Sequence, residues 1–466
     1  MKKVLNILFT IALLAGVLVS CNKDSLEPTL AQSKEIVEGS ISTVGDVKSI
    51  LLGAYDRMTN GSYYGRDYII EGEVRGDNCF SNGNSGRFVR DAKMDWLEDN
   101  VPSGWWSAPY AVIASANIII ALEADAIVGD AAVFNHYKGE AYAIRAMAHF
   151  DLLRYFGQQH VGGTLGVPYI KVYKGDDYTP ARNTLAECET FIMEDIDMGI
   201  SLMNPAQDDA SKQLLTHWGG EALKSRFALY FGDWPAARDA ALAVINSDEY
   251  DIIPAAGFVN FWKSDGGVNS IFELAYSGTD NNNINGLQQI YRGASYGDVE
   301  GLKDLYDAFD VGDIRASAAM IGPDPDPTLL IPKPYVNLGK YPGKNYEDDI
   351  YLIRYEEVVL NYAEALWRIN PADGNALTQL NLITSNRNAV AHAAIDEDII
   401  LLERRRELCF EGFRFHDLAR TGRDIPLVSP LQQTHEGPAY GSYKYAFPIP
   451  LAEMNANSAM EQNPNY

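Results

Sequence analysis

The sequence predicts a mainly α-helical protein, built on tetratricopeptide-like helical hairpins with long irregular loops and little β structure. Apolar residues repeat at spacings of three and four in several stretches. Two of these stretches hold a pair of helical patterns joined by a short turn. The segments between them are rich in Gly, Asn and Pro, which favour turns and loops.

The N-terminus has the pattern of a lipoprotein signal peptide. Lys2 and Lys3 precede a mostly apolar stretch at 4–19, which is shorter than the roughly 20 residues of a spanning helix. Leu18-Val19-Ser20-Cys21 resembles the lipobox of bacterial lipoproteins, in which the cysteine is lipidated and the chain is cut before it. We therefore expect residues 1–20 to be removed and Cys21 to carry the lipid. An ordinary secreted protein is the alternative.

The remainder divides into a tether and a domain. Residues 21–38 are polar after the cysteine and predict a lipidated tether, so 39–466 is expected to form a single domain. Its first helices are predicted at about 43–58 and 105–156, where apolar residues share one helix face. Residues 60–92 are rich in Gly, Asn and aromatics, and we interpret them as irregular loops.

Two helical hairpins are predicted further along the chain. At 215–247, two helical patterns flank a turn of Gly232, Asp233, Trp234 and Pro235, and small residues lie where the helices would cross. A looser hairpin is expected within 350–387, and a loop-rich part at about 250–345. Strict 34-residue repetition is absent, so a plain superhelical array is not expected.

Composition excludes several classes of function. The formal net charge is −25, which disfavours nucleic acid as a partner. Cys79, Cys188 and Cys409 are the cysteines that follow Cys21, too few and too scattered for a disulfide scaffold. Zinc-binding spacings and a phosphate-binding loop are missing from the sequence, so we expect neither a metal nor a cofactor.

Catalytic motifs are weak. "GASYG" at 293–297 matches Gly-x-Ser-x-Gly, yet an α/β context for Ser295 is lacking. Carboxylate pairs could serve glycoside hydrolysis, but 63 acidic residues give too many pairs to single one out. At 401–422, Glu403, Glu407 and Glu411 alternate with arginines, which we interpret as a helix supported by its own ion pairs.

Several stretches together resemble the SusD/RagB family of Bacteroidetes outer-membrane lipoproteins. They follow in order along the chain: "WSAPYAVIASANIII" (106–120), "AIRAMAHFDLLRYFG" (143–157), "IRYEEVVLNYAEAL" (353–366), "ERRRELCFEGFRFHDLARTG" (403–422) and "YAFPIPLAEMNANSAMEQNPNY" (445–466). The resemblance implies a helical, tetratricopeptide-like fold, in agreement with the residue patterns.

The resemblance also implies a function. Family members are non-enzymatic surface lipoproteins that bind oligosaccharides, or in some cases peptides, and deliver them to a SusC-like, TonB-dependent transporter. We therefore expect a protein anchored in the outer membrane by lipid and facing the cell surface. Lys23-Asp24 resembles the charged signal for surface export. The alternatives are a surface glycoside hydrolase on a helical scaffold and a periplasmic tetratricopeptide scaffold.

The ligand site is predicted in two loops, because a sugar needs aromatic platforms flanked by planar polar groups. Trp106 and Tyr110 are excluded because they lie at helical spacing in a scaffold motif. Trp96 could equally fill a gap in the core. The expected ligand-binding residues are Arg75, Asp77, Asn78, Phe80, Arg87, Phe88, Trp96, Tyr291, Arg292 and Tyr296.

Overall fold

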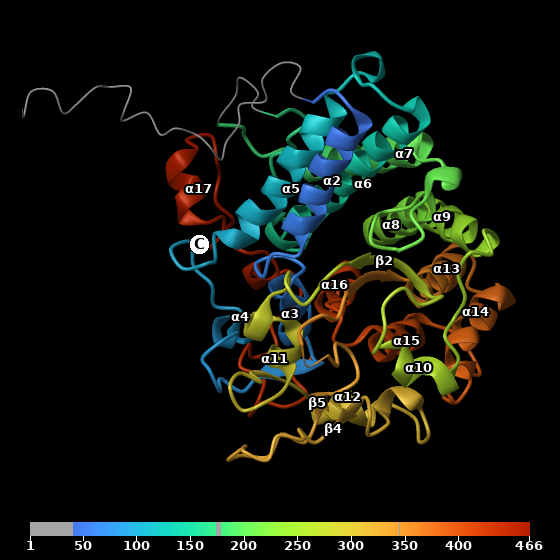
Figure 1. Cartoon of the computed structure of the whole chain (residues 1–466). Helices are drawn as coiled ribbons and strands as arrows, with labels where there is room; N and C mark the ends of the chain where they lie inside the picture. The colour runs from blue at the N-terminus through green and yellow to red at the C-terminus, as the bar shows by residue number, and fades with distance from the viewer. Residues whose placement is uncertain (1–40, 174–178, 344) are drawn as a thin grey trace, which may run out of the picture. The chain divides into compact units, whose positions relative to one another are not determined.

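Helices dominate the computed structural model, which describes residues 41–173, 179–343 and 345–466 (Figure 1). The predicted signal peptide, Cys21 and the predicted tether lie outside the described residues. Residues Val44–Tyr466 form one compact unit. Among the described residues, no helix combines the length and apolar character needed to cross a bilayer. The thiols of Cys79, Cys188 and Cys409 are free and buried.

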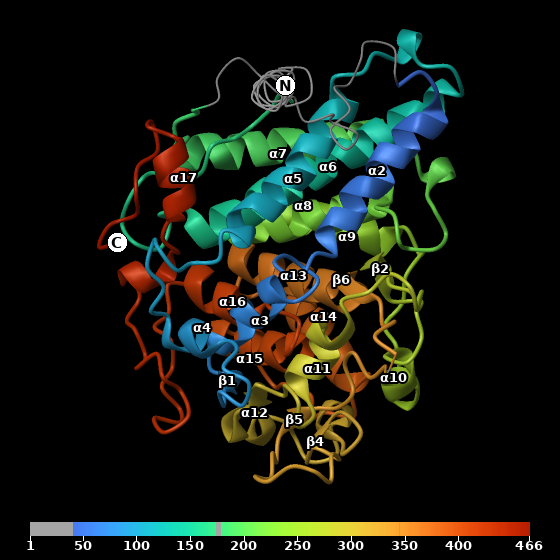
Figure 2. The same ribbon diagram turned by 60° about the vertical axis from the view of Figure 1, so that its left-hand side comes forward.

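The upper layer in Figure 2 is a succession of helices in which each packs against the next. It contains α2 (Val44–Met58), α5 (Gly104–Ile120), α6 (Ala131–Phe156), α7 (Leu185–Leu202), α8 (His217–Phe231) and α9 (Trp234–Asn246). The second hairpin, α13 (Tyr355–Ile369) and α14 (Gly374–Ser385), joins this succession through contacts of α13 with α8 and α9. The mainly helical fold predicted from sequence is confirmed.

Local chemistry explains the α8–α9 hairpin. Gly232 has a φ of 82° and ends α8 in the left-handed conformation that favours glycine. The Asp233 side chain accepts a hydrogen bond from the Ala236 amide, which caps α9, and Pro235 occupies its first turn. Ala237 and Ala241 are fully buried, so the two helices approach closely.

Short antiparallel strand pairs connect segments that are far apart in the chain. β2 (Ser270–Leu274) pairs with β6 (Ile350–Arg354), and β1 (Cys79–Ser81) pairs with β3 (Val299–Gly301). A third pair joins β4 (Ile321–Gly322) to β5 (Val336–Asn337). Further short α-helices are α10 (Ala255–Phe261), α11 (Leu287–Tyr291), α12 (Lys303–Asp307) and α17 (Leu451–Ala456).

The interpretation of residues 60–92 as irregular loops is wrong for three segments. Besides β1, the stretch contains α3 (Asp67–Val74), whose residues are all buried, and the start of α4 (Val89–Lys93). α3 packs against α16 (Arg414–Arg420). Contact is close enough that a Cβ at Gly72 would lie 2.0 Å from the Gly412 carbonyl oxygen. A helix this short and buried on all sides has no amphipathic period to detect.

The ion pairs of α15 (Glu397–Leu408) also differ from the prediction of an internally paired helix. Glu407 receives hydrogen bonds from Arg387 at 2.9 Å and from Arg354 at 3.0 Å, both outside α15. Burial raises the pKa of Glu407, but the guanidinium groups of Arg387, Arg354 and Arg315 outweigh it and leave the pKa well below its usual range. The acidic face is therefore a buried long-range network.

Candidate functional site

A groove opens beside α4, in the part of the molecule where the first predicted binding loop lies. Figure 1 labels α4. Its volume is about 580 Å³, within the roughly 300–1,000 Å³ of small-molecule sites. The groove is lined by Gly86, Arg87, Phe88, Val89, Arg90, Asp91, Lys93, Asp95 and Trp96. Three of the predicted ligand residues, Arg87, Phe88 and Trp96, line it.

The backbone around α4 is held in an unusual shape. Phe88 and Met94, which flank the helix, have left-handed φ values of 57° and 52°. The Asp298 carboxylate accepts hydrogen bonds from the amides of Ser85 at 2.7 Å and Arg87 at 3.3 Å. Strained backbone that the surroundings enforce is frequent at binding sites. Here it fixes the direction in which the Arg87 side chain leaves the loop.

The structure brings the two predicted loops together. The Asn84 side-chain amide donates to the carbonyl oxygens of Ala294 at 2.9 Å and Tyr296 at 2.6 Å. The Arg87 guanidinium carbon lies 3.9 Å from the centroid of the Tyr296 ring. Arg87 Nη2 also donates to Tyr296 Oη at 3.2 Å and to Asn285 Oδ1 at 3.3 Å. Arg87 and Tyr296 therefore form one flat, partly exposed surface next to the groove.

Trp96 is half-buried. It has features both of a ligand-binding residue and of a residue that fills a gap in the core. Its ring meets Trp105 edge to face, with centroids 5.3 Å apart and an interplanar angle of 86°. The remainder of the side chain lines the groove, with the Arg90 guanidinium 5.9 Å from its ring centroid. Trp96 Nε1 is buried and has no hydrogen-bond partner among the described residues. The residue is anchored in the core along one edge and borders the groove with the rest.

Four predicted ligand residues are buried scaffold instead: Arg75, Asp77, Asn78 and Tyr291. The Arg75 guanidinium lies between the rings of Phe415 and Phe447, at 3.8 and 4.2 Å. Asp77 accepts hydrogen bonds from Arg414 at 2.5 and 2.9 Å. Because these side chains are enclosed by protein, we do not retain them in the candidate site.

Asn78 and Tyr291 also bond to other parts of the protein and not to the groove. Asn78 accepts a hydrogen bond from Arg405 Nε at 2.8 Å and donates to Glu73 at 3.0 Å. The Tyr291 hydroxyl donates to the Phe410 carbonyl at 3.1 Å. Both contacts connect the loops to the C-terminal segment.

Phe80, Phe88 and Arg292 expose little surface or bond to neighbouring segments, although Phe88 also lines the groove. Phe80 lies in β1 opposite Glu300 and is 9% exposed, and Phe88 is 7% exposed. Arg292 donates to the carbonyl oxygens of Asn337 and Leu338, each at 2.9 Å, so it holds a neighbouring segment. The partly exposed residues of the predicted set that lie at or beside the groove are therefore Arg87, Trp96 and Tyr296.

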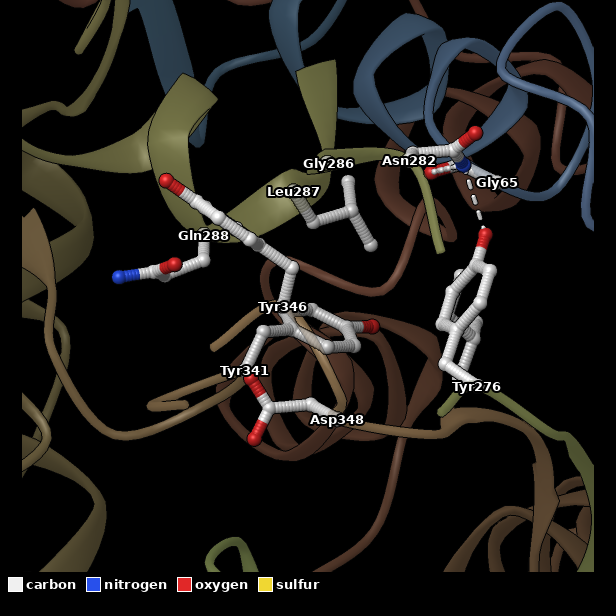
Figure 3. Close-up of a pocket in the computed structure, with 10 residues that line it drawn as sticks. Gly65, Tyr276, Asn282, Gly286, Leu287, Gln288, Tyr341, Tyr346 and Asp348 are labelled. Atoms are coloured by element: carbon white, nitrogen blue, oxygen red, sulfur yellow. Dashed lines mark hydrogen bonds between the residues drawn. The ribbon is translucent and has the colours of Figure 1, made fainter. Parts of the chain in front are cut away.

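A second hollow, not predicted from sequence, is shown in Figure 3. It is lined by Gly65, Tyr276, Asn282, Gly286, Leu287, Gln288, Tyr341, Tyr346, Asp348 and Ile350. Asn282 Nδ2 donates to Tyr276 Oη at 2.7 Å and to the Thr59 carbonyl at 2.9 Å, which fixes one wall. The Asn-rich stretch at 281–286 is the sequence feature that could have indicated this hollow. The residues at 341–350 that line its other side are remote in the chain.

One acidic group could hold a metal ion. Carboxylate oxygens of Asp265, Glu273 and Asp349 lie within 4.8 Å of one another. Burial raises the pKa of Glu273 to about 7 and that of Asp349 to about 6. Both carboxylates already accept backbone hydrogen bonds, Glu273 from Gly266 at 3.0 Å and Asp349 from Tyr276 at 2.7 Å. These bonds hold the two carboxylates in place.

Comparison with known proteins identifies relatives at both ends of the chain. Residues 25–229 match a family model described as "Starch-binding associating with outer membrane", and residues 327–466 match the model of the SusD family. SusD-like protein P38 of Formosa agariphila is 25% identical over the whole of both chains. The starch-binding protein SusD of Bacteroides thetaiotaomicron is 31% identical over 26% of this chain and 22% of its own.

The fold agrees with these matches. A solved structure of a SusD superfamily protein from Bacteroides thetaiotaomicron superposes with a TM-score of 0.83 at 26% identity, over 91% of this chain and all of the other. The family models cover the first helices and the C-terminal hairpin with its buried arginine network, which together form most of the scaffold. The chain belongs to the SusD family.

Proposed function

We propose that this protein is a surface-exposed outer-membrane lipoprotein that binds oligosaccharides, or peptides, and delivers them to a SusC-like, TonB-dependent transporter. The observation that carries the proposal is the groove beside α4, where Trp96 and Arg87, which stacks on Tyr296, line one hollow in a member of the SusD family.

The chemistry of this groove favours a sugar. Sugar rings have apolar C–H faces that pack on aromatic rings, and hydroxyl edges that bond to planar polar groups. Trp96 offers the ring, and Arg87 offers guanidinium N–H groups beside it. The name of one relative, a starch-binding protein, supports the same class of ligand.

Anchoring and delivery follow from the N-terminal pattern and from the family. A lipid on Cys21 would hold the chain at the membrane, and more than one acyl chain gives stable attachment. The tether at 21–38 would let the domain reach a transporter in the same membrane. The family model's association with the outer membrane supports this location.

A surface glycoside hydrolase is the second candidate. Hydrolysis needs two carboxyl groups facing the scissile bond, one of them ionised. Asp91 lines the groove but is 4% exposed and faces buried Glu71, and burial raises the pKa of both carboxyls. This arrangement favours structure over catalysis, so we propose that the protein is not an enzyme.

Binding without turnover is the decisive test. The purified chain from residue 22 onward would be titrated with a panel of neutral oligosaccharides by calorimetry, and the recovered sugars would be analysed by chromatography. We expect saturable heat and intact sugar. Shortened sugars would favour the hydrolase, and binding of peptides alone would move the proposal to the peptide-binding members of the family.

A further inference from the structure

We infer that the groove beside α4 prefers acidic glycans, in which a carboxylate or sulfate group binds to Arg90 and Lys93 while a sugar ring contacts Trp96. The inference rests on the proposed function, because it names the class of sugar that the same groove selects. A neutral oligosaccharide should still bind there, and an acidic one should bind more tightly.

Three cationic side chains line the groove: Arg87, Arg90 and Lys93. Arg90 and Lys93 are exposed and lie three residues apart in α4, a spacing that makes them neighbours on the helix surface. Neither forms an ion pair with a described carboxylate. Arg87 donates to three uncharged side chains at 3.2–3.3 Å. No anion of the described residues therefore neutralises these three charges by direct contact.

The lack of anionic partners contrasts with the rest of the chain. The sequence has 63 acidic and 38 basic residues, so carboxylates outnumber cations. The consecutive arginines at 404–406, for example, each have a carboxylate within 3.2 Å. A cleft lined by charges of one sign concentrates ligands of the opposite sign. The groove therefore favours an anionic ligand.

The acidic residues of the groove lining do not cancel these cations. Asp91 is 4% exposed and lies next to the buried Glu71, and burial raises the pKa of both carboxyl groups. Two buried carboxyl groups in contact do not ionise together readily. Among the lining residues, Asp95 is the exposed carboxylate. Three cations thus face one exposed acid.

The overall charge of the chain opposes this preference only at long range. The formal net charge of −25 slows the approach of an anion. At physiological ionic strength, however, exposed charges more than about 8 Å apart are largely screened from each other. A ligand inside the groove therefore interacts mainly with the lining residues, and its binding should weaken as salt is added.

The geometry places an anionic substituent beside the sugar ring. The Arg90 guanidinium carbon lies 5.9 Å from the centroid of the Trp96 ring. A sugar that contacts Trp96 would therefore bring its ring substituents within reach of Arg90. Carboxylate and sulfate oxygens accept hydrogen bonds from both guanidinium and ammonium groups. The groove volume of about 580 Å³ leaves room for the ring and its substituent.

The test uses two matched pairs of probes. Oligogalacturonides are compared with their methyl esters, and sulfated galactan oligosaccharides with the same oligosaccharides after desulfation. In calorimetric titrations at low salt, we expect the acidic member of at least one pair to bind about tenfold more tightly than its neutral partner, the effect of a charge-assisted hydrogen bond. The pair that shows the preference identifies the anion as carboxylate or sulfate. At about 0.5 M salt the preference should shrink.

A double variant, Arg90→Gln with Lys93→Gln, tests the residues themselves. The ratio of acidic to neutral affinity should fall towards one. The melting temperature should stay nearly unchanged, because both side chains are exposed and unpaired. The control is Arg57→Gln with Lys263→Gln, two exposed cations outside the groove lining. It changes the net charge by the same amount and should keep the ratio of the wild type.

Three outcomes would overturn the inference. They are equal binding of the acidic and neutral members in both pairs, a full preference in the Arg90 and Lys93 variant, or tetraglutamate that binds as tightly as the acidic sugar. If neutral oligosaccharides still bind under these conditions, the proposed function stands and only the preference for acidic glycans is wrong. If no saccharide binds, neutral or acidic, the proposed function itself is wrong.

Discussion

The Arg87 guanidinium lies 3.9 Å from the ring centroid of Tyr296, a residue more than 200 positions later in the chain. Arg87 also donates to the hydroxyl of the same tyrosine at 3.2 Å. The pair therefore connects the loop beside α4 to the loop before β3, and it fixes the guanidinium of Arg87, which lines the groove. The ligand-binding proposal depends on this pair and on Trp96.

Removal of the cation should weaken ligand binding with little effect on folding. We expect Arg87→Leu to reduce oligosaccharide affinity about tenfold, because a charged donor and a stacked surface are both lost. Arg57→Leu is the matched control, since Arg57 is exposed on α2 and bonds only to its own helix in the contacts described. Equal affinity in the two variants, measured by calorimetry, would remove Arg87 from the site.

Trp96→Ala should affect both binding and stability, but unequally. We expect affinity to fall by on the order of 30-fold, the cost of losing a central aromatic anchor. The melting temperature should fall by only a few degrees, since one edge of Trp96 packs on Trp105. Trp367→Ala is a control with a half-buried tryptophan on α13, outside the groove lining. A large loss of stability with intact affinity would make Trp96 a core residue.

The buried network at Glu407 should dominate the effects of charge on stability. Glu407→Gln leaves Arg354 and Arg387 without an anionic partner at this position, and we expect the free energy of unfolding to fall by about 3–5 kcal/mol. Asp307→Asn, in an exposed ion pair with Lys303, should leave stability nearly unchanged. Denaturant unfolding measures both. Equal effects would contradict the role assigned to burial.

Buried Glu140 should make the stability of the protein fall as the pH rises. Burial raises its pKa to about 8, and Tyr55 donates to its carboxylate at 2.5 Å. Because the folded state holds the proton more tightly than the unfolded state, this stabilisation is complete below about pH 4.5 and is lost as the pH rises towards 8.

Glu140→Gln removes this titration and keeps an acceptor for Tyr55. The decrease in melting temperature between pH 5 and 8 should therefore be smaller in the variant than in the wild type. Parallel pH profiles for the two proteins would show that Glu140 is ionised in the folded state across this range.

Membrane attachment tests the N-terminal part of the proposal. With Cys21→Ala, the protein should leave the outer-membrane fraction and lose the mass of the lipid. A SusC-like barrel should co-purify with the wild type from mild detergent. A variant that still fractionates with the outer membrane would contradict lipidation at Cys21, and a wild type that purifies alone in several detergents would count against the transporter complex.

Sequence periodicity predicted the helical scaffold well because its signals are local. The α8–α9 turn, for example, contains its own glycine, cap and proline. Strand pairing and the buried ion network join segments far apart in the chain, so one sequence cannot indicate them. For the same reason Arg75 and Asp77 looked like loop residues, although the C-terminal segment encloses them. Arg87 and Tyr296 were predicted for the site, but their contact emerges only in three dimensions.

Calorimetric titration of the wild type and Trp96→Ala with the same neutral oligosaccharides, followed by chromatography of the recovered sugars, tests the central claim most directly. We predict saturable binding to the wild type, a large loss of affinity in the variant and no shortened sugar from either protein. Release of shortened sugars, or equal binding by both proteins, would contradict the account.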